Sequence, residues 1–88
     1  SVQTINVIST SIYPNPSNGQ ATLTFELKEN DNVVVSIVNI SGQVVNTLNL
    51  GNLNAGSNSV NIDSLPAGAY FVNVKGENGQ ATLKLIVQ

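Results

Sequence analysis

The stretch "LPAGAY", from Leu65 to Tyr70, carries more information about the fold than any other local part of this chain. Pro66 presets φ at the second position of a turn, and Gly68 permits the positive φ that often follows. Tyr70 then opens an alternating run of apolar and polar residues. The stretch therefore predicts a tight corner that delivers Tyr70 into a strand.

Strict alternation of apolar and polar residues dominates the sequence on both sides of this corner. It is clearest from Ala21 to Leu27, which has the pattern of a half-buried strand. The run from Val33 to Val38 is almost continuously β-branched, as in a strand covered on both faces. Further strands are expected around residues 59–63, 70–75 and 82–87, with weaker ones at 5–12 and 44–50, and no segment sustains helical spacing.

Turn residues separate these runs about every 8 to 12 residues, which indicates an all-β sandwich or barrel. The Gly-rich stretch "LGNLNAGSN", residues 50–58, is expected to be one of the loops. In immunoglobulin-like sandwiches, a tyrosine near the start of the sixth strand bonds through its hydroxyl to the backbone a few residues upstream. Tyr70 has that position by our strand count; the alternative is a core residue whose hydroxyl lies in solvent.

We therefore predict an all-β, immunoglobulin-like antiparallel β-sandwich of about seven strands. Its expected core consists of Leu23, Phe25, Val35, Ile37, Val60, Ile62, Tyr70, Val72, Leu83 and Leu85. The hexapeptide "NGQATL" occurs at residues 18–23 and again at 78–83. In each copy Asn-Gly tolerates φ > 0 at a turn and Ala-Thr-Leu begins a strand, so we interpret both copies as turn-to-strand junctions rather than as a duplicated binding site.

The composition excludes several classes of function. With three lysines, no arginine and a net charge of -2, the chain has no basic patch for nucleic acid or for an anionic membrane. No apolar run approaches the roughly 20 residues that span a bilayer, so no membrane insertion is expected. The chain begins at Ser1 rather than Met, and we interpret it as a piece of a longer precursor.

Catalytic, metal and cofactor sites are all expected to be absent. The chain has no His and no Cys, which removes the usual general base and the strongest nucleophile. "ENDN" at residues 29–32 lacks the carboxylate spacing of a calcium loop. Few aromatic residues remain for a sugar platform, with only Tyr13 and Phe71 expected on the surface. The carboxylates are expected on solvated turns and outward strand positions: Glu26, Glu29, Asp31, Asp63 and Glu77.

Four motifs in a fixed order carry a resemblance to a known family. "SIYPNPSNG", "VSIVNISGQVV", "NIDSLPAGAYFVNV" and "ATLKLIV" are similar, from Ile12 to Val87, to the C-terminal sorting domains of the type IX (Por) secretion system of Bacteroidota. The resemblance implies a non-enzymatic signal that follows an N-terminal cargo domain and directs it through the periplasm and across the outer membrane. The implied partners are the translocon and sortase components, and the implied location is secreted or at the cell surface.

The resemblance also assigns roles to individual residues. A structural turn motif is formed by Tyr13, Pro14, Asn15, Pro16 and Gly19. Candidates for recognition or sorting are Gly68, Tyr70, Lys84, Leu85, Ile86, Val87 and Gln88. Leu85 and Gln88 are not among the positions that match the family, and at Gln88 the chain departs from it, since family members often end on a basic side chain. Residues 1–10 are expected to be a lead-in segment or the first strand after the cargo linker, and residues 11–88 the sorting domain, which is expected to be a monomer.

The terminal strand is the natural recognition element, because its edge can be offered for strand addition to a receptor. Lys84 is predicted to point outward there, either as a recognition contact or as protection of the edge against aggregation. The alternative function is a structural or carbohydrate-binding immunoglobulin-like accessory module of a secreted enzyme or adhesin.

Overall fold

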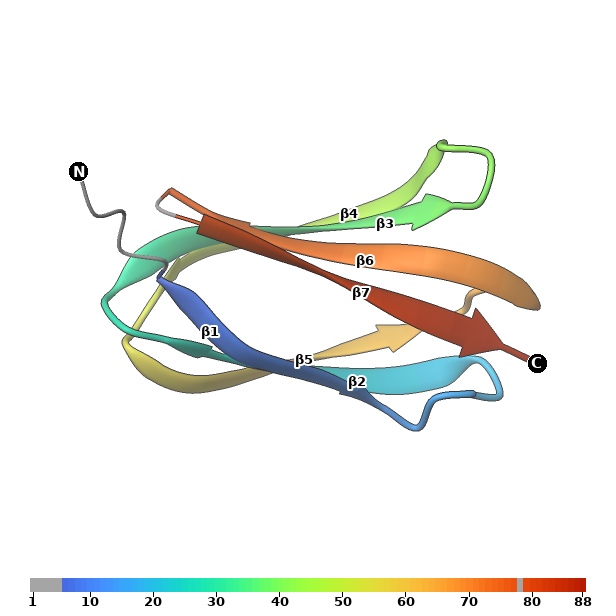
Figure 1. Ribbon diagram of the computed structural model, residues 1–88, viewed down its shortest axis with the longest axis horizontal. Coiled ribbons are helices and arrows are strands. Elements are labelled where there is room, and N and C mark those ends of the chain that lie inside the picture. The colour runs from blue at the N-terminus through green and yellow to red at the C-terminus, as the bar shows by residue number, and fades with distance from the viewer. Residues whose placement is uncertain (1–5, 78) are drawn as a thin grey trace.

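The computed structural model describes residues 6–77 and 79–88 as two antiparallel sheets packed face to face (Figure 1). Helix is absent from this part of the chain, and so is any helical segment able to cross a membrane. The predicted all-β, immunoglobulin-like sandwich is confirmed. Its seven strands are β1 (Val7–Tyr13), β2 (Gln20–Leu27), β3 (Asp31–Asn39), β4 (Val44–Leu53), β5 (Gly56–Asp63), β6 (Gly68–Gly76) and β7 (Gly79–Val87).

The strand order determines which backbone edges are open. One sheet has the order β1-β2-β5 and the other β4-β3-β6-β7. The terminal strand β7 is therefore an edge strand beside β6, and it passes close to β1 of the other sheet (Figure 1). The connection between β1 and β2 lies at the same end of the sandwich as Gln88, where β7 ends.

The core lies between the inward faces that alternation predicts. Phe25 of β2 and Ile37 of β3 are almost completely buried, as is Leu85 of β7. Eight of the ten predicted core residues are buried: Leu23, Phe25, Val35, Ile37, Ile62, Tyr70, Val72 and Leu85. Val60 and Leu83 pack against this cluster but are only half-buried, because β5 and β7 are edge strands with one flank open.

The expectation of a loop over residues 50–58 is wrong. Strand β4 continues to Leu53 and β5 starts at Gly56, so only two residues lie between them. Gly51 has φ +73 and faces Val33, where the register between β3 and β4 shifts. Gly51 therefore lies at a β-bulge inside the strand and does not end it. Glycine within a strand commonly occurs at such a bulge.

Asp31 is buried, whereas the sequence suggested a solvated carboxylate. Its Oδ1 accepts the backbone amides of Asn32 at 2.8 Å and Glu77 at 3.0 Å. Its Oδ2 accepts the side-chain amide of Asn6 at 2.7 Å. A methyl group on Gly76 would collide with this carboxylate. Burial of the charge is tolerated because N–H donors surround it.

Asn6 brings the start of the described chain into the same polar cluster. Its Oδ1 accepts the amide of Glu29 at 2.7 Å, and its Nδ2 donates to the carbonyl of Glu29 at 3.2 Å. Its own carbonyl accepts the amide of Lys28 at 3.0 Å. Because Val7 is also buried, the folded sandwich includes residues 6–10.

Candidate functional site

The predicted tyrosine corner is present at the start of β6, the sixth strand. The Tyr70 hydroxyl donates a hydrogen bond to the Pro66 carbonyl at 2.6 Å, and the ring is buried. Gly68 has φ +154, and a Cβ there would lie 3.7 Å from the Tyr70 ring. The corner therefore fixes the chain between β5 and β6 by one hydrogen bond and one special backbone conformation.

The loop between β1 and β2 binds along the outer edge of β7. The Asn15 side chain donates through Nδ2 to the Lys84 carbonyl at 2.8 Å and accepts through Oδ1 from the Ile86 amide at 3.1 Å. The Ser17 backbone continues the pairing, since its amide donates to the Ile86 carbonyl at 2.8 Å and its carbonyl accepts the Gln88 amide at 2.8 Å. The loop thus replaces a neighbouring strand along the second half of β7.

This pairing changes the expectation that the edge of β7 is offered to a receptor. From the Lys84 carbonyl to the Gln88 amide, the outward backbone groups already have partners in the loop. Strand addition at this position would require the loop to leave first. The "YPNP" segment, predicted as a turn motif alone, also acts as a clamp on a strand about 70 residues further along the chain.

The seven recognition candidates fall into two groups. Tyr70, Leu85 and Val87 are buried and can act only through the shape of the fold. Ile86 is half-buried. The candidates exposed to solvent are Gly68, Lys84 and Gln88, so the Lys84 side chain points outward as predicted.

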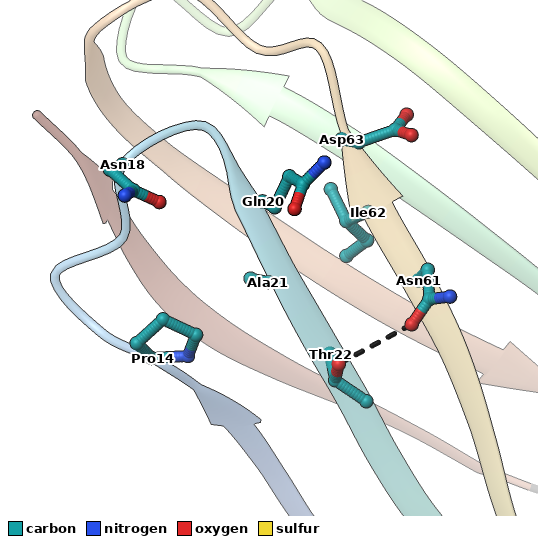
Figure 2. A pocket seen from close by; sticks show the side chains of 8 residues that line it. All are labelled: Pro14, Asn18, Gln20, Ala21, Thr22, Asn61, Ile62 and Asp63. Atoms are coloured by element: carbon teal, nitrogen blue, oxygen red, sulfur yellow. Dashed lines mark hydrogen bonds between the residues drawn. The ribbon is translucent and has the colours of Figure 1, made fainter.

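A half-open pocket of about 320 Å³ lies beside the clamping loop, over the outer surface of β2 and β5. Figure 2 shows Pro14 and Asn18 on one side of it and Asn61 and Asp63 on the other. Between them lies Thr22 of β2, whose hydroxyl donates to the Asn61 side-chain oxygen at 3.3 Å. The remaining lining residues are Gln20, Ala21 and Ile62.

The pocket offers amide and hydroxyl groups around a single carboxylate. Asp63 has no second titratable side chain beside it among the lining residues, so the pocket holds no acid and base pair. Across residues 6–77 and 79–88, no three carboxylates gather closely enough to hold a metal ion. The polar groups that line the pocket are the side-chain amides of Asn18, Gln20 and Asn61, the Thr22 hydroxyl and the Asp63 carboxylate.

The protein is a small immunoglobulin-like sandwich, as its strand order and tyrosine corner show. In its described part, no group of three or more His, Cys, Asp or Glu residues could hold a metal ion. The chain belongs to the family of secretion system C-terminal sorting domains, whose family model matches residues 11–88. Among curated proteins, none matches the chain.

Membership of this family establishes what the domain does. It is a C-terminal sorting signal of the type IX secretion system, and the reading as an accessory module is not favoured. Such a signal sends its protein across the outer membrane to the cell surface or the extracellular space. The family is one of sorting signals and not of enzymes.

Proposed function

We propose that the sandwich acts as a folded, non-catalytic monomeric label, which type IX translocon and sortase components recognise on an N-terminal cargo protein. The observation that carries this proposal is the clamped β7, which keeps the Lys84 side chain outward on a strand whose backbone edge is occupied. A label that is read as a folded object needs a stable shape and an exposed surface, and it needs no active site.

The recognition candidates then have two different roles. Tyr70, Leu85 and Val87 hold this end of the sandwich in shape from within, because they are buried. The exposed Lys84 and Gln88 make the contacts. The Lys84→Ala variant should therefore keep the fold and lose sorting efficiency, whereas deletion of residues 83–88 should lose both.

Removal by a sortase would take place N-terminal to Asn6. Asn6 and Val7 are integrated into the sandwich by hydrogen bonds and by burial, so a protease would have to unfold β1 to cut within residues 6–10. We accordingly place the start of the sorting domain at β1 and the cargo linker before it.

The proposal is tested by fusing residues 1–88 behind a signal peptide and an inert reporter in a Bacteroidota cell. The reporter should leave the periplasm with the intact domain and remain there when residues 83–88 are deleted. Retention of a normally folded intact fusion in a secretion-competent cell would refute the proposal.

A further inference from the structure

Exposed apolar side chains gather at one end of the outer face of the four-stranded sheet. Val38 of β3 is paired with Val44 of β4 on one side and with Phe71 of β6 on the other. Phe71 is in turn paired with Lys84 of β7. Directly paired residues share a face of a sheet, so these four residues, called here the outer row, cross all four strands.

Two of the three apolar residues in the outer row are unusually exposed, and the third, Val38, is half-buried. Val44 is 60% exposed and Phe71 is 44% exposed. Ile40 and Val45 in the adjoining β3–β4 hairpin are 74% and 45% exposed, so this end of the sheet holds four of the six large exposed apolar residues found in residues 6–77 and 79–88. Contiguous exposed apolar surface on a soluble domain is typical of an interaction site.

The charges on the two outer faces of the sandwich are segregated. Along the strands of the four-stranded sheet, the outward charged residues of the described chain are Lys75 and Lys84. On the outer face of the three-stranded sheet, they are Glu26 and Asp63. Glu77, just beyond β6, lines the same hollow of this face as Lys75, at the end away from the exposed apolar residues. Lys84 lies at the apolar end, where the described strand residues of this face include no outward carboxylate.

We propose that the outer row is the surface through which the sorting signal is recognised, and that its partner is a protein surface with an apolar centre and a carboxylate for Lys84. This inference rests on the proposed function and names its contact surface. The clamped edge of β7 supports it, because backbone pairing is closed from the Lys84 carbonyl onward while the side chains of Val44, Phe71 and Lys84 remain accessible.

Two other occupants fit the face less well. A second copy could offer either outer face. The same face would bring lysines against lysines, and on the other face the rows are mostly Ser, Thr, Asn and Gln, such as Ser11, Thr24 and Ser59. On the strands β2 and β5 of that face, the described outward residues include no apolar side chain that could contact Phe71. An anionic membrane would gain only about 1 kcal/mol for each of the two lysines, which is too little to hold the domain.

The test uses the reporter fusion with Val44→Ser and Phe71→Ser combined, and with Ile8→Ser as a matched control. Ile8 is an exposed apolar residue on the opposite sheet, 36% accessible to solvent. We expect the double variant to unfold at the same denaturant concentration as the control and to export at least about tenfold less reporter, the factor given by about 1.4 kcal/mol of lost binding.

A charge series keeps the proposal testable if the double variant fails to fold. Lys84→Glu should lower export by about tenfold or more, because it places a carboxylate opposite the partner's carboxylate. Lys84→Arg keeps the positive charge and should export more reporter than Lys84→Glu. Normal export of a folded double variant, or of Lys84→Glu, would overturn the proposed surface while leaving the sorting function intact.

Two further outcomes are distinguishable from these. If the intact fusion is not exported, the proposed function fails and this surface fails with it. If sedimentation shows that the purified domain self-associates and that Phe71→Ser makes it monomeric, the occupant is a second copy, and our assignment of the partner is wrong.

Discussion

Asn15 pairs with Ile86 as a neighbouring strand would. The Asn15 side-chain oxygen accepts the Ile86 backbone amide at 3.1 Å, while its amide nitrogen donates to the preceding outward carbonyl, that of Lys84, at 2.8 Å. An asparagine side chain has the same donor and acceptor as a peptide unit, so one residue of a loop can complete a strand edge. This relationship links the "YPNP" segment to the last strand, which holds most of the residues that we propose for recognition.

Asn15→Ala should release the second half of β7 without unfolding the sandwich. The substitution removes two hydrogen bonds to the strand, each worth about 1 kcal/mol. Hydrogen exchange followed by NMR should show the Ile86 amide exchanging about tenfold faster, which corresponds to about 1.4 kcal/mol. Asn18→Ala is the matched control, because Asn18 lies in the same loop and its side chain makes no hydrogen bond within the described part. Equal protection of Ile86 in both variants would contradict the clamp.

Tyr70→Phe should lower the free energy of unfolding by about 1 kcal/mol and leave the fold intact, since it removes one hydrogen bond, to the Pro66 carbonyl. Gly68→Val should destabilise the same corner by about 1 to 3 kcal/mol, because a β-branched residue is strained at φ +154. Urea denaturation measures both changes. A Tyr70→Phe midpoint equal to that of the unsubstituted chain would mean that the hydroxyl contributes nothing to the corner.

Much of the fold follows from local rules in the sequence. Alternation at period two predicts both the strands and the inward residues, because one face of each sheet must be apolar to be buried. The Tyr70 corner could be predicted because its proline, glycine and tyrosine lie within six residues. The end of β4 could not, since a glycine inside a bulge and a glycine in a loop look alike in one sequence.

The clamp of Asn15 on β7 and the polar cluster of Asn6 and Asp31 could not be predicted, for a different reason. Asn15 and Ile86 are 71 residues apart, and Asn6 and Asp31 are 25 apart, so nothing local indicates either contact. Asn and Asp near turns ordinarily suggest solvated side chains or local turn hydrogen bonds. The outer row likewise depends on the order of the strands in the sheet, which the alternation of apolar and polar residues does not specify.

Asn6→Ala should destabilise the sandwich although residue 6 lies before the family match. It removes three hydrogen bonds, one of them to the buried Asp31 carboxylate, and should cost about 3 kcal/mol. Asn30→Ala serves as the control, because it removes a single exposed hydrogen bond, from the Ala55 amide, and should cost about 0.5 to 1 kcal/mol. A chain that starts at Ser11 should be less stable still, since it also loses the buried Val7. The measurement is the midpoint of thermal unfolding for the unsubstituted chain, the two variants and the chain that starts at Ser11. Equal midpoints for Asn6→Ala and Asn30→Ala would refute the role of Asn6.

The central claim is that this domain by itself carries the sorting information, and its most direct test is the fraction of an inert reporter found outside the cell. The reporter, with a signal peptide in front and residues 1–88 behind, is expressed in two otherwise identical Bacteroidota strains, one with a working type IX translocon and one without. We predict that most of the reporter is extracellular or at the surface in the first strain and that it stays periplasmic in the second. Equal distribution of a folded fusion in the two strains would contradict the account.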